Sequence, residues 1–413
     1  MSLEQLTDTP TRRRSPAGRL LDQAVISATR RVLRDFEPRG SLTVTAPDGR
    51  RFLLQGSGDG IDADIDFANL KIVPKGIRRG SIGFAQAYMD GDLTTSDLVD
   101  FLRFFLHNED KFGAAGSGLF RERLPDRIYH LLRANTRSGS KRNIAEHYDL
   151  SNDFYGLWLD EGMTYSSAYY DDGANDLASA QHAKYRKVMD ALDLREGHEV
   201  LEIGCGWGGF AETAVGERGA RVTGISLSRA QLAHARERIA RSGLDNRCDL
   251  LFQDYRDTAG SYDRIASIEM IEAVGEEHWP AYFSTLGQRL RRSGVAAIQA
   301  ITIAEPFYEP YRRGVDFIQR YIFPGGMLPT PGIIEAQAQQ AGLVLDGVET
   351  FAHSYARTLR EWRARFLDAW PAISKLGFDD RFRRKWEYYL AYCEAGFLEG
   401  RIDVGIYRLV KPA

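Results

Sequence analysis

Hydrophobic and polar positions alternate in short segments near the start of the chain. Residues 41–44 and 51–54 alternate on either side of Pro47-Asp48-Gly49, which predicts a β-hairpin. Residues 61–73 predict a further strand, and helical periodicity follows between Ser81 and Leu106. These elements together predict a small α+β module that ends near Asn108.

From residue 200 onward, apolar strands alternate with helical segments. Strands are predicted at 200–203, 221–225, 248–252, 264–268 and 294–301, with helices such as 229–241 and 277–292 between them. This alternation is typical of an α/β fold with a doubly wound parallel sheet and a ligand at the carboxyl ends of its strands. Residues 343–351 and 402–410 predict an antiparallel hairpin added to the sheet edge, and an aromatic helical region spans 359–397.

The first residues and one internal loop suggest the domain limits. Residues 1–16 are polar and include Arg12-Arg13-Arg14, which predicts a disordered tail. Residues 18–34 form a basic amphipathic pattern, which we interpret as a surface helix, with a membrane-surface element as the alternative. A polar loop at 134–141 is a domain boundary by composition. We therefore expect an N-terminal α+β domain at 17–134, close to lipid or membrane, and a second domain at 141–413.

Composition narrows the class of protein. The chain of 413 residues is too long for one ordinary domain, and its 43% hydrophobic content is sufficient for a globular core. A net charge of -3 argues against a nucleic-acid binder. Its three cysteines show no metal or redox spacing, and no apolar run of 18 residues occurs. We expect no metal, a cytoplasmic location, and membrane contact only from outside the bilayer.

The glycine-rich segment after the strand at 200–203 carries the first chemical signal. Its glycines allow a ligand to approach the N–H groups at the start of the next helix. Gly204-x-Gly206-x-x-Gly209 matches a dinucleotide fingerprint, whereas Glu202-x-Gly204-x-Gly206-x-Gly208 matches the form that binds S-adenosylmethionine. The next strand ends in Ser226-Leu227-Ser228 instead of the acidic residue of a NAD site, which favours an adenosyl ligand. A purely structural turn remains the third interpretation.

Further motifs occur in a fixed order along the chain. They are NIAEHYDLSNDFY at 143–155, MTYSSAYY at 163–170, QDYRD at 253–257, YIFPGGMLP at 321–329 and YARTL at 355–359. With the glycine segment, they resemble the cyclopropane-fatty-acid synthase family of S-adenosylmethionine methyltransferases, from about residue 61 to the C-terminus. The resemblance implies a Rossmann-like class I methyltransferase sheet. It also implies methyl transfer to a cis double bond of a phospholipid acyl chain.

The resemblance assigns residues to the cosubstrate. Tyr165 and Ser166 are expected near the methionine end, and the glycine loop contributes Glu202, Gly204, Gly206 and Gly208. Around the ribose, the expected residues are Ser226, Leu227 and Gln231, and Asp254 is expected beside the adenine. A turn-forming role is the alternative for Asp254.

The same resemblance implies the catalytic groups. Methyl transfer to an alkene leaves a carbocation, which aromatic rings such as Tyr165 and Tyr355 can stabilise in a dry pocket. Family members hold a bicarbonate ion as the base, and Glu272 and Tyr355 match two of its ligands. This chain departs from the family at Ser167, which replaces a cysteine, and at Ala273 and Gln299, where relatives have histidine. Glu269 is the nearest competitor to Glu272.

These departures bear on the product. Proton loss from the new methyl group closes a cyclopropane, whereas loss from an adjacent chain carbon, with or without a prior hydride shift, leaves a methyl- or methylene-branched alkene. The residues Glu272-Ala273 and Gln299-Ala300-Ile301 resemble the branch that makes mid-chain methyl or methylene fatty acids, including furan-acid precursors. We favour this branch over cyclopropane synthesis. Methylation of a soluble amine and lipid binding without catalysis also stay open at this point.

The expected ligands and partners follow from this interpretation. They are S-adenosylmethionine as cosubstrate, bicarbonate as a bound base, and phospholipid acyl chains at the inner face of the membrane, where the protein would be peripheral. No nucleic acid is expected. A reductase or oxidase that acts on the product, and a homodimer, are left open.

Overall fold

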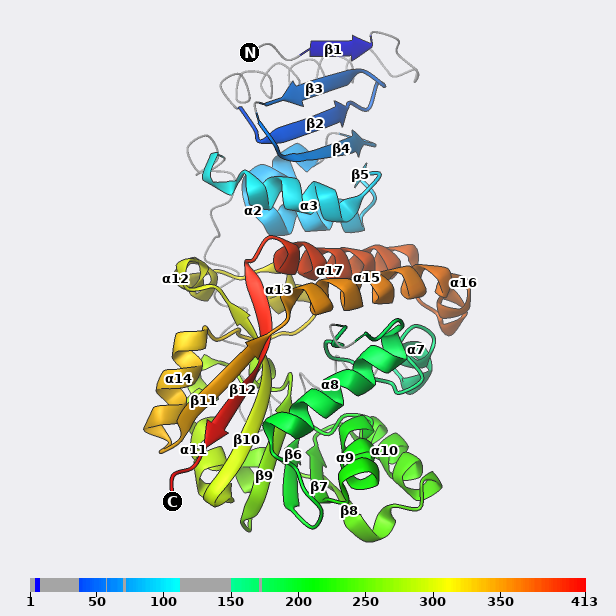
Figure 1. The fold of residues 1–413 in the computed structure, drawn as a ribbon. Helices are drawn as coiled ribbons and strands as arrows, with labels where there is room; N and C mark the ends of the chain where they lie inside the picture. Colours follow the sequence, from blue (N-terminus) through cyan, green and yellow to red (C-terminus); the bar gives the residue numbers. More distant parts are fainter. Residues whose placement is uncertain (1–3, 8–36, 57, 70–71, 112–149, 171–172) are drawn as a thin grey trace. The chain divides into compact units, whose positions relative to one another are not determined.

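The computed structural model describes residues 4–7, 37–56, 58–69, 72–111, 150–170 and 173–413. The chain divides into two compact units, Met1–Asp126 with Gly377–Glu399 and Arg127–Leu376 with Gly400–Ala413 (Figure 1). Most of the tail at 1–16, the basic helix at 18–34, the loop at 134–141 and the motif at 143–149 lie outside the described residues. The domain limits 17–134 and 141–413 therefore stay predictions.

The first unit contains a five-stranded sheet in the order β1-β3-β2-β4-β5. Its strands are β1 (Glu4–Thr7), β2 (Gly40–Thr45), β3 (Arg51–Gln55), β4 (Ile61–Phe67) and β5 (Leu93–Thr94). The antiparallel pair β2–β3 confirms the predicted hairpin.

The strand expected at 61–73 is shorter than predicted. It ends at Phe67, and Ile72 and Val73 belong to helix α2 (Ile72–Met89) instead. Pro74 falls in the first turn of α2, where a proline is tolerated because its missing N–H would have no partner within the helix.

Helix α17 (Asp380–Leu398), near the C-terminus, belongs to the first unit. It packs against α2 and against α3 (Leu98–His107), whose N-cap is Asp97. Arg103 of α3 donates to Glu399 at 2.8 Å. A distant segment of sequence thus completes the core of the N-terminal unit.

The second unit is built on a seven-stranded sheet in the order β11-β12-β10-β9-β6-β7-β8 (Figure 1). The strands are β6 (Glu199–Ile203), β7 (Arg221–Ser226), β8 (Cys248–Phe252), β9 (Tyr262–Ile268), β10 (Leu290–Ile303), β11 (Val344–Thr350) and β12 (Ile402–Val410). The strands from β10 to β8 are parallel, and β12 pairs antiparallel with both β10 and β11. The predicted α/β sheet with an antiparallel edge is confirmed.

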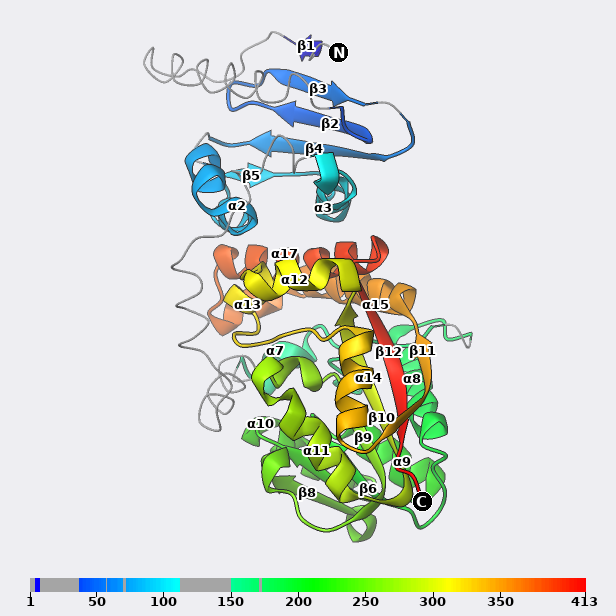
Figure 2. The same ribbon diagram turned by 90° about the vertical axis from the view of Figure 1, so that its left-hand side faces the viewer.

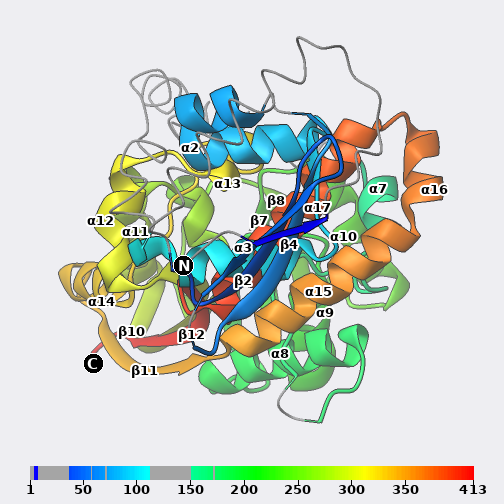
Figure 3. The same ribbon diagram turned by 90° about the horizontal axis from the view of Figure 1, so that it is seen from above.

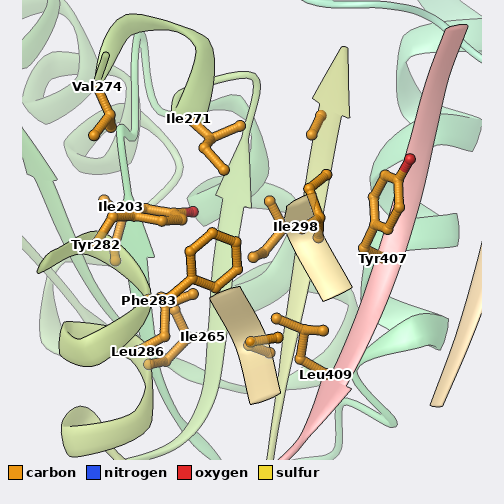
Figure 4. Packing of buried hydrophobic residues seen from close by; sticks show 14 of the residues in the cluster. Ile203, Ile265, Ile271, Val274, Tyr282, Phe283, Leu286, Ile298, Tyr407 and Leu409 are labelled. Carbon is orange, nitrogen blue, oxygen red and sulfur yellow. The ribbon is translucent and has the colours of Figure 1, made fainter. Parts of the chain in front are cut away.

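Helices cover both faces of this sheet (Figures 2 and 3). On one face lie α8 (Leu177–Ala191), α9 (Gly209–Arg218) and α10 (Arg229–Arg241), and on the other lie α11 (Trp279–Arg289) and α14 (Pro331–Gln340). Ile265 and Ile298 from the sheet pack with Phe283 and Leu286 of α11 in a buried cluster (Figure 4). The aromatic helical region expected at 359–397 is made of successive helices, from α15 (Ala352–Asp368) to α17.

Short helices connect these elements. They are α7 (Asn152–Gly156), α12 (Glu305–Arg313), α13 (Phe317–Tyr321), α16 (Trp370–Ile373), η1 (Asp245–Arg247), η2 (Tyr255–Asp257), η3 (Ile271–Ala273), η4 (Glu276–His278) and η5 (Ser374–Leu376). The order of the sheet reverses at β6, whose neighbours are β7 on one side and β9 on the other. Ligands bind outside the carboxyl ends of strands at such a reversal.

Candidate functional site

A cavity opens at the carboxyl ends of β6, β7 and β9, where the strand order reverses. Nine of the ten residues predicted for the cosubstrate line it: Tyr165, Ser166, Glu202, Gly204, Gly206, Ser226, Leu227, Gln231 and Asp254. Gly208 is not among the lining residues. A Cβ atom at Gly208 would lie 3.0 Å from the Cβ of Ala235 on α10, so this glycine permits close helix packing.

The glycine loop presents bare backbone to this cavity. Gly204 and Gly206 have φ angles of +87° and +50°, which residues other than glycine rarely adopt. A Cβ atom at Gly206 would meet no atom within 4 Å, so the space above it is open. Glu202, 3% exposed, has an oxygen, Oε2, with no hydrogen-bond partner among the described residues. Open backbone and an unpaired buried acceptor fit a polar ligand that carries ammonium or hydroxyl donors.

The end of the cavity predicted to hold the ribose and adenine is organised by side-chain caps. Ser228 caps α10 by accepting from the N–H of Gln231, and the backbone N–H of Ser228 donates to Ser226 Oγ at 3.1 Å. Asp254 caps η2 and accepts two bonds from the Arg256 guanidinium, at 2.9 and 2.7 Å. Asp254 therefore has the turn-forming role considered from the sequence, and it also lines the cavity.

Aromatic rings surround Tyr165 at the other end. Its ring centroid lies 5.3 Å from Tyr155, 5.8 Å from Trp158 and 5.3 Å from Trp362. The neighbouring Ser166 accepts a bond from Lys184 Nζ at 2.7 Å. This wall combines apolar surface with faces that attract cations.

Three of the predicted catalytic residues donate hydrogen bonds to one buried carboxyl group, that of Glu269. Ser167 N–H and Gln299 Nε2 donate to Glu269 Oε1 at 2.7 and 2.8 Å, and Tyr355 OH donates to Oε2 at 2.7 Å. Glu269 directly follows β9 and lines the cavity. Its φ of +48° is uncommon for a residue with a side chain and costs conformational energy that the surrounding bonds must offset.

Burial raises the pKa of Glu269, because it disfavours the charged form. The hydrogen bonds from Tyr355, Ser167 and Gln299 and the positive charge of Lys184 act in the opposite direction. Glu269 is thus a buried carboxyl group that accepts three hydrogen bonds at the cavity wall, with a pKa above the ordinary value for glutamate. This combination is typical of a carboxylate that accepts a proton.

Glu272 occupies a different environment. It lies on η3, outside the residues that line the cavity, and its Oε1 accepts from Ile301 N–H at 2.5 Å. Its Oε2 is buried without a partner among the described residues. Burial, and next the charge of Glu269, raise the pKa of Glu272 to about 8. The donors that the sequence assigned to the surroundings of Glu272 converge on Glu269 instead.

Strand geometry explains this difference. Glu269 follows the last residue of β9 and so lies at the rim where a parallel sheet binds ligands. Three residues later, the η3 turn directs Glu272 toward β10. Position relative to the strand end thus distinguishes the two acids in the folded chain.

Lys184 and Tyr185 were not predicted from the sequence. Tyr185 lines the cavity, and Lys184 is fully buried and donates to Ser166, which also lines it. Both lie on the buried stripe of α8 with Gln181. The sequence signal that could have identified these two residues is the presence of polar side chains at core positions of an amphipathic helix.

Comparison with known proteins decides the family. The model for mycolic acid cyclopropane synthetase matches residues 135–406. The chain belongs to this family. The resemblance expected from its motifs is thereby confirmed, and the family places it among S-adenosylmethionine-dependent methyltransferases that modify fatty acyl chains. S-adenosylmethionine is its cosubstrate.

Two curated relatives and one solved structure illustrate the similarity. Tuberculostearic acid methyltransferase UfaA1 of Mycobacterium tuberculosis is 40% identical over 81% of this chain and 80% of its own. Cyclopropane-fatty-acyl-phospholipid synthase of Escherichia coli K12 is 34% identical over 89% of this chain and 94% of its own. The crystal structure of mycolic acid cyclopropane synthase CmaA1 with SAH and CTAB covers 66% of this chain and 98% of its own, at 31% identity and a TM-score of 0.63.

Among the helices that the structure describes, none has both the length and the apolar character needed to cross a membrane.

Proposed function

We propose that this family member methylates the double bond of an unsaturated phospholipid acyl chain and produces a methyl- or methylene-branched chain, with Glu269 as the proton acceptor. The observation that carries this proposal is the convergence of Tyr355, Gln299 and Ser167 on Glu269 at the cavity wall. The name of the tuberculostearic acid methyltransferase, 40% identical to this chain, supports the branched product.

The residues divide the reaction between them. Bound S-adenosylmethionine would supply an electrophilic methyl group. The π electrons of the alkene form a bond from one alkene carbon to this methyl group as the carbon–sulfur bond breaks. The other alkene carbon becomes a cation, close to aromatic faces such as Tyr165. For a methyl-branched product, a C–H bond on a carbon next to the cation breaks, its electron pair forms the new double bond, and the proton passes to Glu269. For a methylene branch, a hydride first shifts from the methylated carbon to the cationic carbon, and a C–H bond of the new methyl group then breaks to form the double bond, again with the proton passing to Glu269. Alignment in a dry cavity supplies much of the catalysis, because an alkene is a weak nucleophile.

The bicarbonate predicted from the sequence has no role in this scheme. The predicted donors at Ser167, Gln299 and Tyr355 already bind the Glu269 carboxylate, which presents the same kind of anionic oxygens. Gln299 cannot exchange a proton near neutral pH, and Tyr355 acts here as a donor. We therefore assign the base to the protein itself.

The test is product analysis with purified enzyme, S-adenosylmethionine and vesicles of dioleoyl phosphatidylglycerol, in buffers with and without bicarbonate. Fatty acid methyl esters would be resolved by gas chromatography and mass spectrometry against cyclopropane and branched standards. We expect branched products at the same rate in both buffers. Cyclopropane as the sole product would contradict the branch, and loss of turnover without bicarbonate would contradict Glu269 as the base.

The remaining partners follow from the substrate. Acyl chains of phospholipids lie in a bilayer, so we propose that the enzyme works as a peripheral protein at the inner face of the membrane. A reductase or oxidase that acts on the product, and a homodimer, stay predictions.

A further inference from the structure

Lys184 is a buried cation to which the mechanism above assigns no role. Its side chain is 0% exposed, on the face of α8 that packs into the second unit. A buried ammonium group loses hydration energy, so charged partners or hydrogen bonds must compensate for it. What surrounds Lys184 therefore indicates its role.

Its hydrogen bond connects it to the wall of the cavity. Lys184 Nζ donates to Ser166 Oγ at 2.7 Å, and Gln181 Nε2, one turn earlier on α8, donates to Ser166 O at 2.8 Å. Two side chains of one helix thus hold both the hydroxyl and the carbonyl of Ser166. Ser166 lines the cavity beside Tyr165.

Its charge faces carboxylates from three parts of the second unit. They are Glu269 after β9, Asp160 in the turn after α7, and Glu202 of β6, and they act against burial, which lowers the pKa of Lys184 to about 8. Lys184 and Glu269 also bind neighbouring residues, because Lys184 Nζ donates to Ser166 Oγ and Ser167 N–H donates to Glu269 Oε1. Asp160 already accepts from the N–H groups of Gly162 and Thr164. Among the described residues, Glu202 Oε2 has no hydrogen-bond partner. Glu269 in turn accepts hydrogen bonds from Tyr355, Ser167 and Gln299, and its charge raises the pKa of Glu272.

We propose that Lys184 is a positioning residue with two separable effects: its hydrogen bond fixes Ser166 against bound S-adenosylmethionine, and its charge keeps Glu269 ionised for proton removal. The second effect rests on the proposed function of Glu269, whereas the first does not. A cation close to a carboxylate favours the ionised form, so loss of Lys184 raises the pKa of Glu269.

Two substitutions separate these effects. Lys184→Met removes both the donor and the charge at similar volume, whereas Lys184→Gln keeps an N–H donor and removes only the charge. Lys187→Met is the matched control, because Lys187 lies one turn further along α8 and pairs with Glu349 at 2.9 Å. Thermal unfolding of each variant verifies folding.

The measurements are S-adenosylmethionine affinity by calorimetry and the pH dependence of kcat. We expect Lys184→Met to weaken the affinity for S-adenosylmethionine about tenfold. We also expect it to shift the acidic limb of the pH profile of kcat to higher pH by about one unit. Lys184→Gln should move the limb equally while its affinity stays within about threefold of wild type. Lys187→Met should leave both quantities unchanged.

Contrary results identify which part fails. Wild-type affinity in Lys184→Met would overturn the positioning of Ser166. An unmoved limb in both Lys184 variants, with Glu269→Gln inactive, would overturn the electrostatic effect and leave the proposed function intact. An active Glu269→Gln would overturn the proposed function, while the affinity comparison would still decide the role of Lys184 at Ser166.

Discussion

Two glutamates three residues apart have opposite environments in this enzyme. Glu269 accepts three hydrogen bonds at the cavity wall, whereas Glu272 keeps one oxygen buried without a partner among the described residues. Glu272 has a single donor, the N–H of Ile301, and a buried carboxyl group with few donors is more stable when it holds a proton. We therefore expect Glu269 to be charged and Glu272 neutral at neutral pH.

Glu272→Gln tests the neutral state of Glu272. The pKa of Glu272 in the folded protein, about 8, lies above its ordinary value of 4.5, so the folded state binds more protons between these limits. Its contribution to stability is fully present below about pH 4.5 and is lost as pH rises toward 8. The melting temperature of Glu272→Gln should therefore rise relative to wild type as pH increases from 5 to 8. A difference that is constant with pH would mean that Glu272 is ionised throughout.

The glycine loop shows how an element prepares a binding surface. Gly206 combines a positive φ with open space on the cavity side, so a side chain there would enter the ligand's volume. Gly197, before β6, has a φ of +79° and also meets no atom within 4 Å, but it does not line the cavity. The two glycines share a left-handed backbone conformation and differ in their access to the ligand.

Gly206→Val should abolish S-adenosylmethionine binding, whereas Gly197→Val should retain it. Both variants should lose about 1–3 kcal/mol of stability, because each forces a β-branched residue into a left-handed conformation. Calorimetry and denaturant unfolding measure the two quantities separately. Equal affinity in both folded variants would exclude the loop from the binding site.

Local patterns predicted most elements of the second unit. Hydrophobic runs placed β8 at its observed limits and the other central strands within a few residues. The region expected to be helical at 359–397 is divided into α15, α16, η5 and α17, with breaks at Ala369 and around Gly377 that aromatic periodicity does not reveal. The preference for Glu272 over Glu269 followed a motif, and only the path of the chain after β9 distinguishes the two. Tertiary contacts of this kind are not encoded in local periodicity.

At the scale of the whole molecule, the first unit is discontinuous in sequence. Trp386 of α17 belongs to this unit and is 1% exposed, and Trp279 of α11 lies in the core of the second and is 2% exposed. Each is a large buried side chain, and the two belong to different units. A matched pair of substitutions can therefore report on each unit by itself.

Trp386→Ala should increase hydrogen exchange in β2, β3 and α3, and Trp279→Ala should increase it in β9 and β10. Each substitution should destabilise its own unit by about 3–5 kcal/mol, because it leaves a large cavity in a packed core. Hydrogen exchange with mass spectrometry resolves the two regions. If Trp386→Ala instead increases hydrogen exchange first in β9 and β10, α17 belongs energetically to the second unit.

The most direct test of the proposed mechanism compares turnover of Glu269→Gln with that of Glu272→Gln, each with saturating S-adenosylmethionine and unsaturated phospholipid vesicles. Glutamine keeps the shape of each side chain and removes its capacity to accept a proton near neutral pH. We predict that Glu269→Gln lowers kcat at least about 100-fold, with S-adenosylmethionine affinity close to wild type, because its role begins only after the carbocation forms. Glu272→Gln should keep most of its turnover. The reverse ranking, or near-normal turnover by Glu269→Gln, would contradict the assignment of Glu269 as the base.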